Sequence, residues 1–269
     1  MALPRGGEAS ATPRVPPGAS RLPGAPPRSP YHAGALIPLR DTIPSRSVPL
    51  VNGALIASCV GVFVLQLLAG SGGEGLVRAF GFVPARLFHA GDLGPGSLGL
   101  GALGLLTSMF LHGGLLHLAG NMLFLWIFGD NVEDALGHGR FLLLYLGSGV
   151  LAALLQGVIA PSSLVPMVGA SGAIAGVLGA YFVLYPHARV VTLVPLFFLF
   201  PLVEVPAFLF LLLWFLLQFW QGSASLLDAG RAASGGVAWW AHVGGFAAGI
   251  ALLVVLKPRR RPAPRYWIR

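Results

Sequence analysis

Charged side chains are scarce in this chain. Only 10% of its 269 residues are Asp, Glu, Lys or Arg, whereas 55% are hydrophobic. With a mean hydropathy of +0.79, this much apolar surface cannot be hidden in the core of a soluble protein of this length. The composition therefore predicts an integral membrane protein, with the lipid bilayer as its immediate partner.

Cysteine is nearly absent, because Cys59 is the only one and lies in an apolar run. A single cysteine excludes an intrachain disulfide and a Cys/His metal framework.

Basic residues are present but confined mostly to the ends. Of 17 Lys and Arg residues, six precede residue 48 and six follow residue 256. These tails lack the aromatic interleaving of a nucleic-acid platform, so no nucleic-acid partner is predicted, and anionic lipid headgroups are the expected contact. Residues 1–47, rich in Pro, Gly and Arg, are predicted to be a disordered cytoplasmic tail, and 258–269 a basic cytoplasmic tail.

Residues 48–257 contain the long apolar runs and predict an all-α, polytopic bundle of six transmembrane helices. An even number of spans places both termini on one side, and the positive-inside rule assigns that side to the cytoplasm. The six predicted spans are about 49–69, 111–129, 140–160, 170–186, 204–221 and 238–256.

Five polar side chains stand out within these apolar runs. His112, His117 and Asn121 lie in the first part of span two, Ser171 at the start of span four, and His242 near the start of span six. Because these three spans run in the same direction, the five groups are expected at a similar depth, as a site built between helices requires. A serine nucleophile with a histidine base is the simplest chemistry for this set.

Glycines predict that spans four and six approach closely. Gly172 and Gly176 form one small-xxx-small row on span four, and Gly245 and Gly249 form another on span six. Each row begins beside a reactive residue, so a hydrogen bond between that serine and that histidine becomes possible. At a helix N-terminus the serine would also lie where backbone N–H groups stabilise an oxyanion.

Three segments together resemble the rhomboid intramembrane serine proteases of the bacterial six-span type. They are Leu111–Met122, Gly169–Gly172 and Ala241–Gly249, in that order on spans two, four and six. Gly129–Glu133, continuing to Gly137, extends the resemblance, which covers about residues 36–257.

The resemblance implies roles for these residues. Ser171 would be the nucleophile and His242 its general base in a dyad without a third acidic residue, although an external-loop carboxylate beside the histidine stays open. His117, Asn121 and the Ser171 N–H would bind the oxyanion, and His112 would shape or hydrate the cavity. The supporting glycines are Gly169, Gly172, Gly176, Gly245 and Gly249.

The implied reaction is hydrolysis of a peptide bond in or near a transmembrane helix of a membrane protein, through an acyl-enzyme and without a cofactor or metal. A bacterial inner membrane is the expected location, and the oligomeric state stays open. The family also implies that span five is a movable wall against span two, with Trp214 or Phe215 closing the gap near Gly120 unless both aromatics face lipid.

Two other classes of protein are alternatives. A haem or metal protein could use His112, His117 and His242, but the first two are five residues apart and do not share a helical face. A non-catalytic rhomboid-like protein could bind membrane helices, but such proteins usually lack the serine or the histidine that this chain has.

Overall fold

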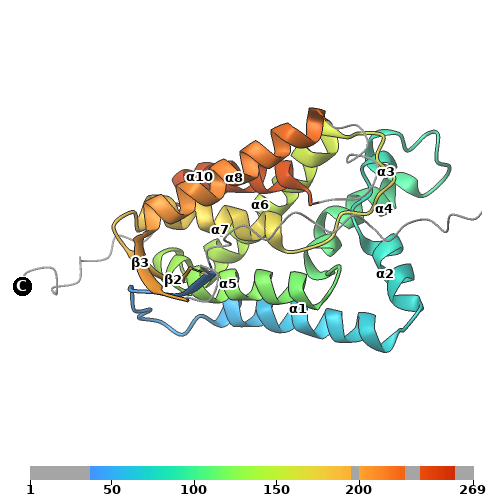
Figure 1. The fold of residues 1–269 in the computed structure, drawn as a ribbon. Helices are drawn as coiled ribbons and strands as arrows, with labels where there is room; N and C mark the ends of the chain where they lie inside the picture. Colours follow the sequence, from blue (N-terminus) through green and yellow to red (C-terminus); the bar gives the residue numbers. More distant parts are fainter. Residues whose placement is uncertain (1–36, 195–199, 228–236, 258–269) are drawn as a thin grey trace, which may run out of the picture. The chain divides into compact units, whose positions relative to one another are not determined.

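The computed structural model describes residues 37–194, 200–227 and 237–257, which lie in one compact unit, Leu36–Arg269 (Figure 1). The predicted tail 258–269 and most of the predicted tail 1–47 lie outside the described residues.

The helices are α1 (Leu50–Leu68), α2 (Gly72–Phe80), α3 (Pro84–Phe88), α4 (Ser97–Thr107), the 3₁₀ helix η1 (Ser108–Phe110), α5 (Leu115–Leu136), α6 (His138–Ile159), α7 (Ser171–Leu184), α8 (Ala207–Leu227) and α10 (Trp239–Leu256).

Five of the described helices are long and apolar enough to cross a membrane, namely α1, α5, α6, α8 and α10. The fourth predicted span, 170–186, corresponds to α7, which has only 14 residues and is about 21 Å long, against a hydrocarbon core of about 30 Å. The predicted class, a helical polytopic membrane protein, is confirmed. The count of six spans is matched by five long helices and the short α7 in the described residues, so it is not confirmed in full.

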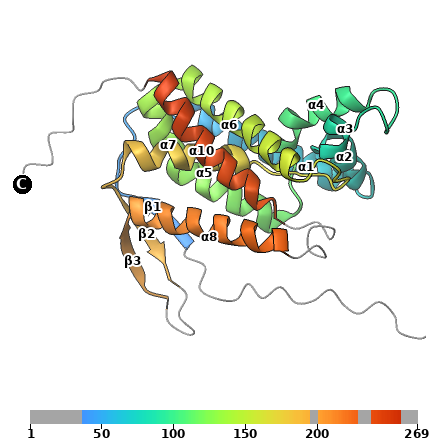
Figure 2. The same ribbon diagram turned by 90° about the horizontal axis from the view of Figure 1, so that it is seen from above.

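Helix α7 is the centre of the bundle. It packs against α5, α6, α8 and α10, and Figure 2 shows it enclosed by these neighbours. Its middle is buried continuously from Ala173 to Tyr181. A short helix can remain in a membrane protein when other helices cover it, because its ends then need not reach the lipid surface. The N-terminal end of α7 is thereby held inside the protein.

The contact between α7 and α10 is a contact between backbones. A Cβ atom added to Gly245 would overlap the carbonyl oxygen of Gly172, and one added to Gly249 would overlap that of Gly176. On the other side of α7, a Cβ at Gly176 would also overlap Ser148 of α6. The two glycine rows therefore lie against each other, as small residues at membrane-helix crossings commonly do.

A small sheet lies at one end of the bundle and was not predicted. Strands β1 (Ile37–Asp41), β2 (Arg189–Leu193) and β3 (Leu202–Pro206) are antiparallel in the order β1-β2-β3, with an irregular register in β1 between Pro38 and Arg40. Residues 37–41 were predicted to belong to the disordered tail 1–47, and this is wrong because they form strand β1. Its pairing partner lies far along the chain, so the strand has no signal in its local sequence.

Helix α5 also extends beyond the predicted end of span two at residue 129. Its last turns contain Glu133, which is 1% exposed, and whose carboxylate accepts hydrogen bonds from the N–H groups of Val51 (2.9 Å) and Asn52 (2.7 Å). These belong to the first turn of α1, where free N–H groups favour an anion. His138, the first residue of α6, contacts the same carboxylate. One buried carboxyl group thus joins three helices.

Asp41 connects the sheet to the bundle. Its carboxylate accepts hydrogen bonds from the Tyr181 hydroxyl of α7 (2.5 Å) and the Asn131 amide of α5 (2.7 Å). Burial raises the pKa of Asp41 from 3.8 to about 6, the Tyr181 hydrogen bond opposes this rise, and the nearby charge of Asp130 adds to it. The folded state therefore binds a proton more tightly than the unfolded state, so the contribution of Asp41 to stability falls as pH rises from about 4 to about 6.

We expect Gly249→Val to destabilise the bundle strongly, because the added carbons must displace the backbone of α7. Overpacking of this kind costs about 1–3 kcal/mol or more. Gly53→Val is the matched control, since a Cβ at Gly53 of α1 meets no atom within 4 Å. Thermal unfolding in detergent measures the difference, and equal midpoints for the two variants would contradict the close crossing.

Replacing Asp41 with Asn should reduce the pH dependence of stability. The Asn side-chain oxygen can still accept the Tyr181 and Asn131 hydrogen bonds, but it has no charge to bury. Between pH 4.5 and pH 7 the unfolding midpoint of the unmodified protein should therefore fall relative to that of Asp41→Asn. Parallel pH profiles would show that the carboxyl group does not titrate in this window.

Candidate active site

Ser171 is the first residue of α7, and the segment before it is fixed by backbone hydrogen bonds. Phe82 and Met167 exchange both of their backbone hydrogen bonds, and Gly169 N–H donates to the Ser108 carbonyl at 2.9 Å. The first turn of α7 follows directly, with Ile174 N–H bonded to the Ala170 carbonyl. The N–H groups before this bond have no acceptor within the helix and lie at its positive end.

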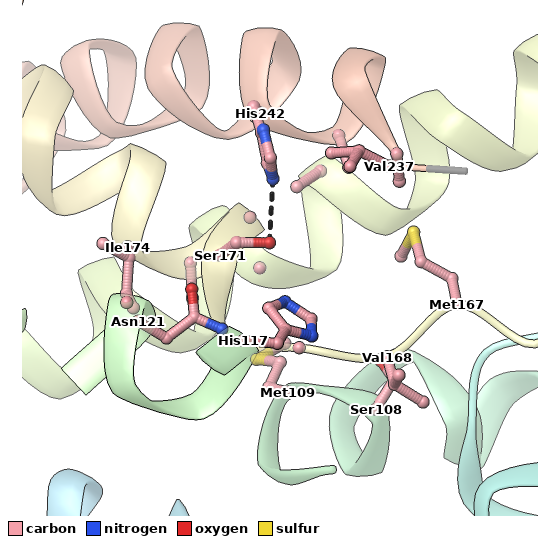
Figure 3. Close-up of a pocket in the computed structure, with 18 of the residues that line it drawn as sticks. Ser108, Met109, His117, Asn121, Met167, Val168, Ser171, Ile174, Val237 and His242 are labelled. Atoms are coloured by element: carbon pink, nitrogen blue, oxygen red, sulfur yellow. Dashed lines mark hydrogen bonds between the residues drawn. The ribbon is translucent and has the colours of Figure 1, made fainter. Parts of the chain in front are cut away.

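Ser171 and His242 are in direct contact. The Ser171 hydroxyl oxygen lies 2.8 Å from Nε2 of His242, which is in the first turns of α10 (Figure 3). His242 is 9% exposed. The glycine crossing between α7 and α10 begins one residue after the serine, at Gly172 opposite Gly245. The backbone approach therefore brings these two short side chains within hydrogen-bonding distance.

The other ring nitrogen of His242 meets a residue that the sequence analysis did not identify. Nδ1 lies 2.7 Å from Oε1 of Gln218 on α8, and the Trp214 ring lies 5.9 Å from the imidazole. The third group left open by the sequence is an external-loop carboxylate, whereas the structure has a neutral amide there. The sequence does contain one sign of Gln218, because it is a polar residue within the apolar fifth span, four positions after Trp214.

His117 and Asn121 lie on one face of α5, below Ser171 in Figure 3. The Gly113 N–H points at Nδ1 of His117 (3.4 Å), so the proton of a neutral ring belongs on Nε2, where it can be donated. Among the described residues the buried Nδ2 of Asn121 has no hydrogen-bond partner. Two donors are therefore available on this side of the serine.

These groups share one cavity of about 700 Å³. Its mostly apolar wall is formed by segments of α5, α7, α8 and α10 together with the strand-like segment before Ser171. The polar residues that line it are Ser108, His117, Asn121, Ser171, Gln218 and His242. A few convergent polar groups in an apolar cavity are typical of a small-substrate or catalytic site.

Gly169 lines this cavity at a position where other residues would be strained. Its φ is +123°, and a Cβ there would lie 2.7 Å from Cε1 and 2.8 Å from Nε2 of His117. Glycine permits both the backbone conformation and the approach of the ring. The residue thus keeps His117 beside the start of α7.

His112 occupies a different place from the one predicted. It lies in the loop before α5 rather than in a transmembrane span, and it does not line the cavity of Ser171. Its backbone N–H and C=O both bond to the Gln66 amide of α1 at 3.1 Å, and its ring packs edge-on against His117 at 5.4 Å. His112 thus contacts His117, is bonded to α1 through Gln66, and lines a neighbouring cavity.

Trp214 and Phe215 of span five pack toward α10 and not against Gly120 of span two. Both are partly buried: Trp214 packs on His242, and Phe215 lies 4.9 Å from Phe246 of α10. No atom comes within 4 Å of a Cβ added to Gly120. Aromatic rings join α5 to α8 elsewhere, through Phe124 and Phe210 at 6.4 Å.

Metal chemistry has no obvious ligand set in the described ranges. Among residues 37–194, 200–227 and 237–257, no group of three or more His, Cys, Asp or Glu side chains is arranged to hold a metal ion. His112, His117 and His242 do not form such a group.

The chain is similar to several rhomboid proteins. One match is to the Rhomboid protease GluP of Bacillus subtilis (strain 168), with 40% identity over 118 residues, covering 44% of this chain and 21% of that protein. Rhomboid protein 1, mitochondrial, of Saccharomyces cerevisiae is 40% identical over 103 residues, covering 37% of this chain and 28% of that protein. Presenilin-associated rhomboid-like protein, mitochondrial, of Homo sapiens is 36% identical over 96 residues, covering 35% and 25%.

The chain thus spans less than a third of the length of each of these relatives. The Rhomboid domain family itself matches residues 101–259, which is more than half of the chain and includes α5, α7, α8 and α10. This integral membrane protein belongs to the rhomboid family.

Proposed function

We propose that this protein is an intramembrane serine endopeptidase that cleaves peptide bonds in or near the transmembrane helices of other membrane proteins. The observation that carries the proposal is the 2.8 Å contact between the Ser171 hydroxyl and Nε2 of His242 in a cavity enclosed by membrane helices. The similarity to the bacterial Rhomboid protease GluP supports the same activity.

In the first step, Ser171 Oγ attacks the carbonyl carbon of the scissile peptide bond. A serine hydroxyl is a weak nucleophile, so His242 Nε2 accepts its proton as the new C–O bond forms. His242 then donates that proton to the leaving amine, the C–N bond breaks, and the substrate acyl group remains on the serine oxygen.

The negative charge on the tetrahedral intermediate needs fixed donors. His117 through Nε2–H, Asn121 through Nδ2–H and the N–H of Ser171 are the proposed set. The unpartnered, buried Nδ2 of Asn121 favours this role, because a buried amide donor without an acceptor is costly unless a ligand supplies one. Donors already oriented toward the oxyanion stabilise the transition state without reorganisation.

Deacylation repeats the chemistry with water as the nucleophile. His242 takes a proton from water, the hydroxide attacks the acyl carbonyl, and Ser171 recovers its proton from the histidine. The cavity volume of about 700 Å³ can hold an extended peptide segment with water. A substrate helix must unwind locally, since helical peptide bonds are hydrogen-bonded and shielded by side chains.

The proposed location is a bacterial inner membrane, with both termini in the cytoplasm. Basic residues at the β-sheet end of the bundle support this orientation under the positive-inside rule: Arg140 donates to the Lys257 carbonyl at 2.8 Å, and Arg189 begins β2. In this proposal residues 48–257 form the membrane domain, β1 precedes it on the cytoplasmic side, and the basic segments at both ends of the chain are cytoplasmic. The substrates are transmembrane proteins.

A fluorophosphonate probe should label Ser171 in the purified protein, and Ser171→Ala should abolish both labelling and proteolysis while retaining the unfolding midpoint. The reason is that only a serine activated by a base reacts readily with this electrophile. His242→Ala should also lose activity. Undiminished cleavage of a transmembrane substrate by folded Ser171→Ala would reject the nucleophile assignment.

The proposed oxyanion donors lead to a second prediction. Asn121→Ala and His117→Ala should each lower kcat by about 10- to 1000-fold, the range for loss of one donor from a shared set. Trp126→Leu is the control on the same helix, because Trp126 is 68% exposed and does not line the cavity. Steady-state rates in detergent provide the measurement, and wild-type kcat in both donor variants would remove this role from them.

A further inference from the structure

Gln218 is a buried polar residue in an otherwise apolar helix. It is 7% exposed and lies one helical turn after Trp214 on α8, so both side chains face α10. A polar group at this depth of a membrane helix is expensive unless its hydrogen bonds are satisfied. Both polar atoms of the Gln218 amide have partners.

Those partners determine which way the amide points. Nε2 of Gln218 donates to the Trp214 backbone carbonyl at 3.3 Å. A carbonyl oxygen only accepts, so it must face the NH₂ group of the amide and not its oxygen. Oε1 therefore faces His242, at 2.7 Å from Nδ1.

An amide oxygen likewise only accepts, so the nitrogen that faces it must carry a proton. This assigns the proton of neutral His242 to Nδ1 and leaves a lone pair on Nε2, the atom that faces the Ser171 hydroxyl. The opposite tautomer would place two acceptors 2.7 Å apart and direct an N–H at the serine oxygen. That tautomer could not accept the serine proton.

We propose that Gln218 is the positioning residue of the Ser171–His242 pair. Gln218 selects the tautomer of His242 that can act as a base, and it fixes the plane of the imidazole ring. The inference rests on the proposed protease function. Gln218 takes the place in this site that a carboxylate holds in a Ser-His-Asp triad, but it is neutral, so it orients the imidazole without a full charge to stabilise its protonated form.

The surroundings of the ring agree with this assignment. Trp214 and Trp239 lie 5.9 and 6.1 Å from the imidazole and limit its rotation. Among the described residues the hydrogen-bond partners of the ring are Gln218 and Ser171, and neither is a carboxylate. The base is thus oriented by α8, a different helix from the one that holds the nucleophile.

The test compares Gln218→Leu and Gln218→Glu with the unmodified protein. Leu removes the hydrogen bond at similar volume, and we expect kcat to fall about 10- to 100-fold with little change in KM, less than the loss of the base itself. Glu retains an acceptor for Nδ1–H and adds a negative charge, so it should recover part of kcat and move the acid limb of the pH profile to higher pH. Leu216→Ala, on the exposed face of α8, is the control and should be unaffected.

Nitrogen-15 NMR of histidine-labelled protein provides a readout that does not depend on activity. The signal of His242, identified by its loss in His242→Ala, should report a proton on Nδ1 in the unmodified protein and a mixture of tautomers in Gln218→Leu. A proton on Nε2 in the unmodified protein would overturn the inference. So would equal kcat losses for Leu and Glu with an unchanged acid limb, because that is the pattern of a purely structural role.

The two proposals fail in different ways. If the unmodified protein neither cleaves a substrate nor reacts with a fluorophosphonate, the protease proposal fails, while the NMR measurement still decides the tautomer. If the unmodified protein is active and Gln218→Leu matches it in kcat and pH profile, the positioning role is refuted and the protease proposal stands.

Discussion

The site depends on the contact between the backbones of α7 and α10. Gly245 and Gly249 lie directly against the carbonyl groups of Gly172 and Gly176, at a separation that no residue with a Cβ would permit. Serine and histidine have short side chains, so they can share a hydrogen bond only if their helices approach this closely. Because α7 is short and covered by neighbouring helices, the same contact also fixes the depth of the serine.

Around this crossing, each neighbouring helix contributes one part of the proposed chemistry. Helix α5 supplies the two donors for an oxyanion, α8 supplies the amide that orients the imidazole, and α6 supports α7 from the opposite side. The buried carboxylates of Asp41 and Glu133 lie away from the cavity and join strands and helix ends. Acidic residues therefore serve the architecture of this protein, while a neutral glutamine faces the histidine.

Much of this arrangement follows from the sequence, since polar residues are costly in membrane helices and glycines mark close contacts. The relation between Ser171, His242 and the two glycine rows could be predicted in that way, as could the shared face of His117 and Asn121. Strand β1 could not, because its partner is distant in the chain. Gln218 was missed because a lone amide in an apolar run gives no sign of its partner, and His112 was misplaced because an apolar loop resembles the start of a span.

The central claim is that this cavity hydrolyses a peptide bond within or beside a membrane helix. The most direct measurement is mass spectrometry of the products formed from a single-span substrate in proteoliposomes prepared in H₂¹⁸O. The account predicts a single cut in or next to the transmembrane segment, with one ¹⁸O in the new carboxyl group, and no cut with Ser171→Ala. An intact substrate, or cleavage confined to loops far from the membrane, would contradict it.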